Sequence, residues 1–578
     1  MLWRKFIYVA VVLVFALSGC ADVGDDTPND YAALADGAIS LVSESAREIV
    51  FHVVLPELTL TEAETELGVF TRLEAAGYPY YGQVGEPALP ALREIVSLPL
   101  GARVTVTAEP LLVDTIALDH PVLPNQPPVE KLPGALENRE FVYDADAYSI
   151  DAYTVGRFAA MTEEGMMRNH RLGMLEITPI DYNPAGGELL VARELRVTVH
   201  LNGADIAATQ EMAREYGVPA FDAILGNQAA NPGKTWNLFS QPTAGAAYLI
   251  IYANTFASSS ALNQFKTLKQ NDGWTVHTAS MSDVGSNTVV GIRNFIIEKY
   301  DAIPSLTFVL LVGDTDTIAG ASGFASNYPA TDIYYSCMNS TDYYPDLLLG
   351  RFPARTEAQL ANMVAKTAAY EAAAGLKTAT FMASTDNYSI TEGTHNTVIN
   401  YFLSPHSYTV NKLYTVTYSA TTQQVKNAIN AGTNYAIYSG HGSETSWADG
   451  PAFSQSDVAS LTNTRYPFVC SFACLTGKYT LAESFAETWL RDDHAGVAMI
   501  ASSVTSYWDE DDWFEKAMFL GMFNFPWTGY PDQIWAASAM LCGKFGVWRM
   551  SNFGGGSSHR YFEMYNLFGD PSLEVYTY

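Results

Sequence analysis

Two residues with complementary chemistry, His441 and Cys474, each follow a short apolar run in the second half of the chain. Glycines on both sides of His441 allow backbone there to approach a ligand closely. A thiol beside an imidazole is the arrangement of a nucleophilic cysteine, whose thiolate attacks a carbonyl carbon. The pair therefore predicts acyl transfer, with Cys474 as nucleophile and His441 as general acid and base.

The apolar runs before these residues, 435–438 and 468–472, are rich in Tyr, Ile, Val and Phe. Such runs are typical of buried strands in a parallel sheet, and the loops beyond the carboxyl ends of those strands carry function. The 33 positions that separate His441 from Cys474 are enough for a crossover with one helix. Cys470 lies inside the second run, so we predict that it is a core thiol and that Cys474, at the strand end, is reactive.

Short apolar runs and helical patterns alternate from about residue 248 to residue 541. This alternation predicts an α/β fold with a mostly parallel sheet. We expect two side-by-side subdomains, 247–375 and 376–578, with the Cys/His site in the second.

Several segments of this region resemble one known family, and they occur in the same order. They are Gly440-His-Gly-Ser-Glu-Thr445, Phe472-Ala-Cys474 with Gly477, Tyr248-Leu-Ile-Ile-Tyr252, Phe308-Val-Leu-Leu-Val-Gly-Asp314, Gly350-Arg-Phe352 and Asn566-Leu-Phe-Gly-Asp-Pro-Ser-Leu573. The set resembles the gingipains, secreted bacterial cysteine peptidases related in fold to caspases. The resemblance covers roughly residue 247 to the C-terminus and implies a caspase-like peptidase that acts on proteins or peptides.

The resemblance also suggests the remaining members of the site. The segment 383–386 resembles the one that carries the carboxylate orienting the imidazole, so Asp386 is expected in that role; Glu444, three residues after His441, is a competitor. The backbone N–H groups of Gly442 and Cys474 are expected to form the oxyanion hole.

Substrate preference is predicted from the run 500–508, which resembles the segment that lines the S1 pocket. Trp508 would pack against the stem of a basic side chain. Glu392 is the nearest match to the carboxylate of Arg-specific members, and we therefore expect cleavage after Arg or Lys. The alternative is that Trp508 is a core residue and that the acidic residues 509–512 are a solvated helix start.

Length, charge and cysteine content restrict the class of protein. A chain of 578 residues with 48% apolar residues is expected to fold into two to four globular domains. Its net charge of −30 argues against nucleic acid as a partner, because phosphate binding needs clusters of Lys and Arg. Five cysteines in this length do not form a disulfide framework.

The first twenty residues have the pattern of a targeting segment. A basic start is followed by a twelve-residue apolar run at 6–17 and by Leu17-Ser-Gly-Cys20, which looks like a bacterial lipoprotein cleavage box. We predict a signal peptide over 1–20 and lipidation of Cys20, the only membrane contact expected; an ordinary secretory signal is the alternative. Both place the protein outside the cytoplasm, at the cell surface, on the outer membrane or secreted.

Residues 48–200 contain alternating polar and apolar runs that predict half-buried antiparallel strands. The resemblance places an N-terminal prodomain here, within a region 21–246 that also includes a tether and a linker; a permanently attached β-sandwich spacer is the alternative. The linker begins near residue 209, and its basic residues Arg214 and Lys234 are candidates for self-cleavage.

These observations predict a surface-anchored cysteine endopeptidase made as a proenzyme. A transpeptidase that uses the same acyl-enzyme and a non-enzymatic surface lipoprotein are the alternatives. The chemistry requires no cofactor. Asp332, Asp342 and Asp346 are typical of turn-capping aspartates, although such oxygen clusters also bind calcium, as the gingipains do, so a structural calcium ion is the second interpretation. The sequence predicts no oligomeric state.

Overall fold

The computed structural model describes residues 38–237, 246–338, 342–373, 375–523, 534–551 and 557–575. The predicted signal peptide and Cys20 lie outside the described residues. Within the described residues, no helix combines the length and the apolar character needed to cross a membrane.

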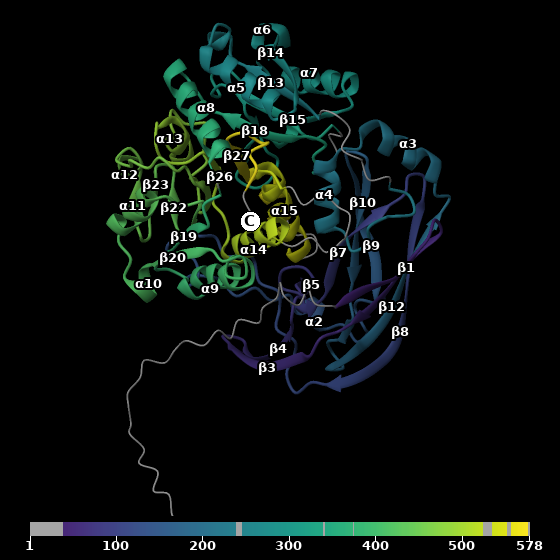
Figure 1. Ribbon diagram of the computed structural model, residues 1–578. Helices are drawn as coiled ribbons and strands as arrows, with labels where there is room; N and C mark the ends of the chain where they lie inside the picture. The colour runs from purple at the N-terminus through teal and green to yellow at the C-terminus, as the bar shows by residue number, and fades with distance from the viewer. Residues whose placement is uncertain are drawn as a thin grey trace, which may run out of the picture.

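The N-terminal part of the chain is a β-rich unit, drawn in purple and blue in Figure 1. Its strands pair antiparallel in two main sheets, and β2 alternates buried and exposed side chains as a half-buried strand should. The strands of the larger sheet are β1 (Ile39–Glu44), β2 (Glu48–Val54), β8 (Arg103–Ala117), β11 (Ile180–Asn183) and β12 (Glu188–Asn202). The smaller sheet contains β7 (Leu92–Leu98), β9 (Ala159–Met167) and β10 (His170–Ile177).

The C-terminal part is built on one ten-stranded sheet, which confirms the predicted α/β class. In spatial order the strands are β14 (Thr275–Ser280), β13 (Ala247–Tyr252), β15 (Leu306–Val312), β18 (Leu348–Phe352), β27 (Tyr565–Phe568), β26 (Ala498–Ser502), β25 (Phe468–Phe472), β21 (Tyr435–Ser439), β19 (Thr378–Ala383) and β20 (Thr409–Tyr414). Every pair is parallel except β26 with β27.

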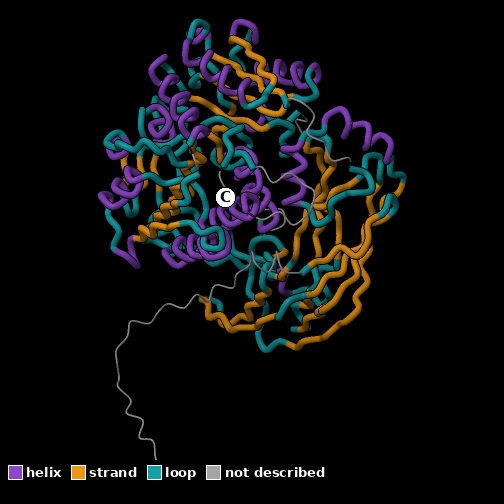
Figure 2. The backbone as a smooth tube through the Cα atoms, viewed as in Figure 1, coloured by secondary structure: helices purple, strands orange, loops and turns teal. Residues whose placement is uncertain are grey.

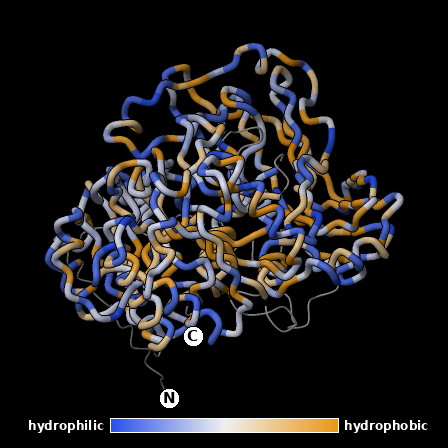
Figure 3. Tube along the Cα trace, turned by 90° about the horizontal axis from the view of Figure 1, so that it is seen from above, coloured by the Kyte–Doolittle hydropathy of each residue, from blue (hydrophilic) through white to orange (hydrophobic). Residues whose placement is uncertain are grey.

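The two predicted subdomains are thus the two halves of one continuous sheet. Strand β27, close to the C-terminus, lies between them and pairs with β18 on one side and β26 on the other. The central strands are buried along their whole length, because helices pack on the sheet (Figure 2). Figure 3 shows hydrophobic segments gathered towards the middle of the molecule. The sequence pattern did not predict β27, because its four residues follow directly on helix α16 (Ser557–Met564) with no turn residue between them.

Helices connect the strands and cover the sheet. They include α5 (Ser260–Asn271), α7 (Val289–Ala302), α8 (Glu357–Ala372), α9 (Tyr388–Val398), α11 (Thr422–Ala431), α13 (Phe485–Arg491), α14 (Trp508–Phe523) and α15 (Ala536–Met550). Between β21 and β25, helix α12 is a single turn, Gln455–Val458.

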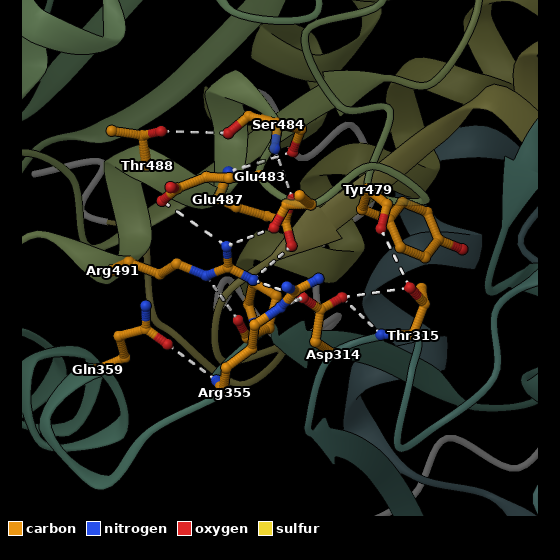
Figure 4. A network of polar contacts seen from close by, with 12 residues as sticks. Asp314, Thr315, Arg355, Gln359, Tyr479, Glu483, Ser484, Glu487, Thr488 and Arg491 are labelled. Atoms are coloured by element: carbon orange, nitrogen blue, oxygen red, sulfur yellow. Dashed lines mark hydrogen bonds and ion pairs between the residues drawn. The ribbon is translucent and has the colours of Figure 1, made fainter.

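A buried network of charges joins the two halves of the sheet on one side (Figure 4). Asp314 follows β15, and its carboxylate lies 2.7 Å from the guanidinium of Arg491 on α13. The same guanidinium lies 2.7 Å from Glu487, and Arg355 also contacts Asp314. Burial raises the pKa of Glu487 to about 7 despite the adjacent arginine. Because one arginine holds carboxylates of both halves, the network fixes their relative position.

The β-rich unit packs against the α/β region through a short helical segment. Helix α3 (Ile206–Tyr216) is followed by α4 (Pro219–Gln228), which is largely buried and packs against α14 and α15 (Figure 1). An ion pair between Glu94 of β7 and Arg549 of α15, 3.6 Å apart, lies at this junction. The N-terminal unit is therefore docked on the face of the sheet that α14 and α15 cover.

Candidate active site

The predicted nucleophile and base lie side by side at one edge of the sheet. His441 follows β21 and Cys474 follows β25, and these neighbouring parallel strands pair Ser439 with Phe472. Their carboxyl ends therefore meet at the same edge. Both side chains reach one oxygen atom, the carbonyl of Lys131: the His441 Nδ1 atom is 2.8 Å from it and the Cys474 Sγ atom 3.4 Å.

The structure places Asp386 where the imidazole needs an orienting carboxylate. This residue follows β19, the next strand beyond β21, and its Oδ2 atom lies 2.9 Å from the Nε2 atom of His441. The backbone N–H of Asn387 donates to the other carboxylate oxygen at 2.9 Å, which fixes the group. The competitor Glu444 instead pairs with Lys478 at 3.2 Å. Cys474, His441 and Asp386 thus lie in the order that a relay of nucleophile, base and orienting carboxylate requires.

The backbone around the nucleophile is tightly packed and strained. Leu475 adopts a left-handed conformation with φ of 62°, which is rare for a leucine and turns the chain sharply after Cys474. A Cβ atom on Gly442 would come within 2.5 Å of the Cys474 carbonyl oxygen, so only glycine fits there. The two backbone segments predicted to form the oxyanion hole are therefore in contact.

The second thiol of this region, Cys470, lies in the middle of β25 and is fully buried. Its Sγ atom is 3.9 Å from the sulfur of Met518. Burial raises the pKa of Cys470 well above its ordinary value, as expected of a thiol in an apolar core.

The thiol of Cys474 is held in its protonated form in this state of the molecule. A reactive thiolate is favoured by a lowered pKa, whereas burial raises the pKa of Cys474 to about 11. Burial is the main cause, and the negative charge of Asp511 adds to it, while the N–H of Ser506 and the ammonium of Lys131 act in the opposite direction. Cys474 is only 1% exposed, because the N-terminal unit covers it.

We therefore expect alkylation of Cys474 to be suppressed as long as the N-terminal unit is docked. With a pKa near 11, roughly one thiol in ten thousand is ionised at pH 7, and the thiolate fraction rises tenfold per pH unit up to the pKa. Iodoacetamide labelling of the intact chain, followed by mass spectrometry, should show little modification at pH 7. After removal of the N-terminal unit, labelling at the same pH should increase by at least a hundredfold. Equal rates before and after removal would contradict this assignment.

The segment that covers the thiol lies on the site as an added strand. The N–H of Lys131 donates to the carbonyl of Ser506 at 2.8 Å, and the N–H of Trp508 donates to the carbonyl of Val129 at 3.2 Å. Glu130 and Tyr507 form the antiparallel bridge between these two contacts. This is the way in which an extended peptide binds to an exposed backbone edge, so residues 129–131 occupy the site as a peptide ligand would.

The side chain of Lys131 enters a pocket below the catalytic pair, and its ammonium has three acceptors. The Nζ atom lies 2.8 Å from the Asp511 carboxylate, 2.9 Å from the Phe472 carbonyl and 3.2 Å from the Ser439 hydroxyl. Both charged groups are excluded from water. Because an ammonium has three N–H donors, this pocket satisfies it fully.

Two features of the pocket shape it around this side chain. The ring of Trp508 has its centroid 4.9 Å from the Lys131 Nζ atom, a cation–π distance. The Asp511 carboxylate is fixed by hydroxyl donors, namely Ser506 to Oδ2 at 2.7 Å and Tyr561 and Tyr565 to Oδ1 at 2.8 and 2.6 Å. The pocket therefore presents a preorganised negative charge.

The structure gives Glu392 contacts away from the pocket that holds Lys131. This residue lies on α9, where its carboxylate accepts hydrogen bonds from the backbone N–H and the hydroxyl of Thr417. The carboxylate of the pocket is Asp511, within the acidic run that the alternative interpretation assigned to a solvated helix start. Asp511 is 1% exposed, because the first turn of α14 faces the pocket.

Neither Lys131 nor Asp511 is predicted as a site residue by the sequence pattern. Lys131 stands in a Pro-rich loop between two regular regions, and nothing in its neighbours marks it. For Asp511, one signal was available, namely that it follows closely on a segment expected to line the S1 pocket.

Two of the three aspartates considered for calcium, Asp332 and Asp346, have contacts of other kinds. The Asp332 carboxylate accepts two hydrogen bonds from Arg351 at 2.7 and 2.8 Å. Asp346 accepts from the backbone N–H groups of Arg168 and Met338. Among the described residues, no three or more His, Cys, Asp or Glu side chains are grouped so that they could hold a metal ion. Turn and ion-pair roles account for the contacts of Asp332 and Asp346, and the calcium interpretation gains no support from them.

Comparison with known proteins gives a family match for each of the two parts of the chain. The model of peptidase family C25 matches residues 241–576, and that of its propeptide (Propeptide_C25) matches residues 30–215. The chain is 29% identical over 567 residues to Lys-gingipain of Porphyromonas gingivalis, covering 90% of this chain and 32% of that protein. It is 25% identical over 474 residues to Gingipain R2 of the same organism, covering 76% of this chain and 60% of that protein.

The solved structures agree with this placement. The crystal structure of the Arg-specific cysteine proteinase gingipain R matches with a TM-score of 0.51 and 25% identity, covering 58% of this chain and 80% of that one. The caspase-like fold expected from the sequence is thereby confirmed. The chain spans about a third of the length of Lys-gingipain. Since the family model matches more than half of the chain, the chain belongs to peptidase family C25 and includes the family's propeptide.

Proposed function

We propose that the protein is a lysine-specific cysteine endopeptidase held inactive by its own propeptide. The observation that carries the proposal is the position of Lys131. Its ammonium lies 2.8 Å from the buried Asp511, and its carbonyl oxygen contacts both Cys474 and His441. The propeptide thus offers the site a lysine in the place where the residue before the scissile bond of a substrate, P1, would bind.

The chemistry follows from the arrangement of the three side chains. His441 takes the proton of Cys474. The thiolate then forms a bond to the carbonyl carbon of the P1 lysine, while the π electrons of the carbonyl group move onto its oxygen. The protonated imidazole, oriented by Asp386, then gives its proton to the leaving amine as the C–N bond breaks. Water, activated by His441, attacks the thioester, releases the acid product and restores the thiol.

Lys131 occupies this site in an unproductive way. Its carbonyl oxygen points at the thiol and at the imidazole Nδ1 atom, which are the attacking group and the base. In a productive complex that oxygen would point at the backbone N–H groups of Gly442 and Cys474. The bound propeptide therefore blocks proton transfer between His441 and Cys474 while it fills the pocket.

The pocket suits lysine better than arginine. A guanidinium binds a carboxylate best through two parallel N–H donors, which requires both carboxylate oxygens. In this pocket the hydroxyl groups of Tyr561 and Tyr565 already bind Oδ1 of Asp511. The three separate acceptors around the Nζ atom fit a compact ammonium instead.

The proposed preference for lysine also selects between the two candidate sites of propeptide cleavage. Of the two candidate basic residues, Arg214 lies within helix α3, whose backbone is not extended. Lys234 is exposed in a turn shortly before β13, the first strand of the peptidase. Cleavage after Lys234 would separate the propeptide from the family-model region and give a mature chain that starts at Thr235.

The proposal is tested with chain expressed without residues 1–20 and allowed to process. Fluorogenic peptides that differ only at P1 should be cleaved after lysine at least tenfold faster than after arginine, and after neutral residues at a rate near background. N-terminal sequencing of the mature chain should read Thr235. Equal cleavage after all residues would contradict the pocket assignment. Ligation to an added amine in place of hydrolysis would point to a transpeptidase.

The N-terminal residues support an extracytoplasmic location, tethered by a lipid on Cys20. This part of the proposal rests on the sequence of residues 1–20 alone. Incorporation of labelled fatty acid into the protein, lost on Cys20→Ser, would demonstrate the anchor.

A further inference from the structure

A buried arginine lies beside the position that precedes P1 in the propeptide. Arg560 belongs to α16, and its side chain is 2% exposed. The Glu130 carboxylate lies 3.7 Å from its Nη2 atom. Glu130 directly precedes Lys131, so it occupies the place of the P2 residue of a substrate.

The peptidase supplies only neutral partners to this arginine. Its guanidinium donates to the hydroxyl of Ser326 at 2.5 Å, and to the hydroxyl and carbonyl of Thr505 at 2.6 and 2.7 Å. The ring of Tyr507 lies 4.9 Å from the Cζ atom. The Nε atom is buried without a hydrogen-bond partner. Within the part of the chain that the structure describes, Glu130 of the propeptide is the only carboxylate within 4.0 Å of Arg560.

Thr505 connects the arginine to the P2 carboxylate. Its hydroxyl accepts from Arg560 and donates to the Oε1 atom of Glu130 at 3.2 Å. The same Oε1 atom forms the ion pair with the Nη2 atom. The P2 carboxylate therefore meets a hydroxyl donor and a fixed positive charge, a combination that recognises an acidic side chain and leaves a neutral one without compensation.

We propose that Arg560 and Thr505 form an S2 subsite that selects an acidic residue directly before the P1 lysine. This inference rests on the proposed function and names a substrate class for it, proteins with Glu-Lys or Asp-Lys sequences. When the propeptide leaves, Arg560 loses the one carboxylate that lies within 4.0 Å of it among the described residues. Its remaining partners there are neutral hydroxyl and carbonyl groups, so an acidic P2 residue restores a charged pairing.

The test uses the processed enzyme and four peptides that share valine at P3 and lysine at P1. They carry glutamate, aspartate, glutamine or lysine at P2, so that glutamate and glutamine form a nearly isosteric pair. We expect kcat/KM to be about tenfold higher for glutamate than for glutamine, as for hydrogen bonds to charged groups. Lysine at P2 should be the poorest. Because Glu130 is one-third exposed, the preference should shrink as NaCl rises from 0.05 to 0.5 M.

Two comparisons separate this inference from the proposed function. Arg560→Gln should bring the rate on the glutamate peptide close to that on the glutamine peptide, while the ratio of lysine to arginine at P1 stays as in the wild type. Arg560 is buried, so active-site titration must first show that the variant folds; the wild-type peptide ratio tests the inference without any variant. Equal wild-type rates on glutamate and glutamine, with P1 lysine still preferred, would overturn the S2 assignment alone. If no peptide is cleaved by an enzyme whose thiol titrates, the proposed function fails, and the S2 assignment fails with it.

Discussion

Replacing Cys474 with alanine should lower cleavage of lysine peptides by a factor of about 10⁴ or more. The substitution removes the group that we propose forms the acyl-enzyme, since the Sγ atom of Cys474 lies at the strand end, 3.4 Å from the carbonyl oxygen of Lys131. His441 and Asp386 keep their contact but have no thiol to activate. The rate is measured on variant chain whose propeptide has been removed with active wild-type enzyme.

Cys470→Ala is the matched control, because the same atom is removed four residues earlier. Cys470 is buried in β25 against Met518, so its loss should reduce the free energy of unfolding by about 1–2 kcal/mol and leave kcat/KM within a factor of about two. Cys474→Ala should therefore lose activity, whereas Cys470→Ala should lose stability and keep its activity. Substantial thiol-dependent cleavage by Cys474→Ala, or its loss in a folded Cys470→Ala, would refute the assignment of the nucleophile.

Replacing Asp511 with asparagine should reduce kcat/KM on lysine peptides by roughly 10²–10³. The pair that Asp511 forms with the Lys131 ammonium is fully buried, and removing one partner of such a pair costs about 2–5 kcal/mol or more. Part of that loss is the cost of burying the remaining ammonium against a neutral amide. We expect the effect in KM and kcat together, because a loosely held P1 side chain also misplaces the carbonyl carbon.

Glu392→Gln provides the control and also tests the residue that the sequence favoured. The Glu392 carboxylate binds Thr417 on α10 (Thr415–Tyr418), so its neutralisation should change kcat/KM by less than about threefold. The preference for lysine at P1 should be lost in Asp511→Asn and preserved in Glu392→Gln. The reverse result would show that the pocket seen around Lys131 is not the one that substrates use.

The propeptide contacts explain how one segment can cover the site and also indicate the substrate preference that we propose for it. Residues 129–131 bind along the backbone of 506–508, and two of their side chains occupy separate subsites. The pairs Lys131–Asp511 and Glu130–Arg560 have opposite polarity, so the propeptide segment matches the charge of each subsite that we propose. An inhibitory segment that is complementary to the site reports which substrates the site prefers.

The amino-acid sequence by itself determined the catalytic edge of the sheet. Strand β25 spans the residues predicted for it, and β21 exceeds its predicted run by one residue. Apolar runs of this length have few alternatives to a buried parallel strand, and such strands place the residues that follow them at one edge. Cys474, His441 and Asp386 could therefore be predicted from local pattern together with the family resemblance.

Only the tertiary structure decided which charges form the subsites. Glu392 and Asp511 are both acidic residues near the start of a helix, and no local pattern distinguishes a carboxylate that binds Thr417 from one that faces a pocket. Lys131 is separated from Cys474 by 343 positions, and Arg560 from Glu130 by a still longer interval. Contacts across such distances depend on how the propeptide docks and where α16 packs. Local sequence places Cys474 and His441 at the ends of neighbouring strands, whereas the specificity and the latency that we propose come from long-range packing.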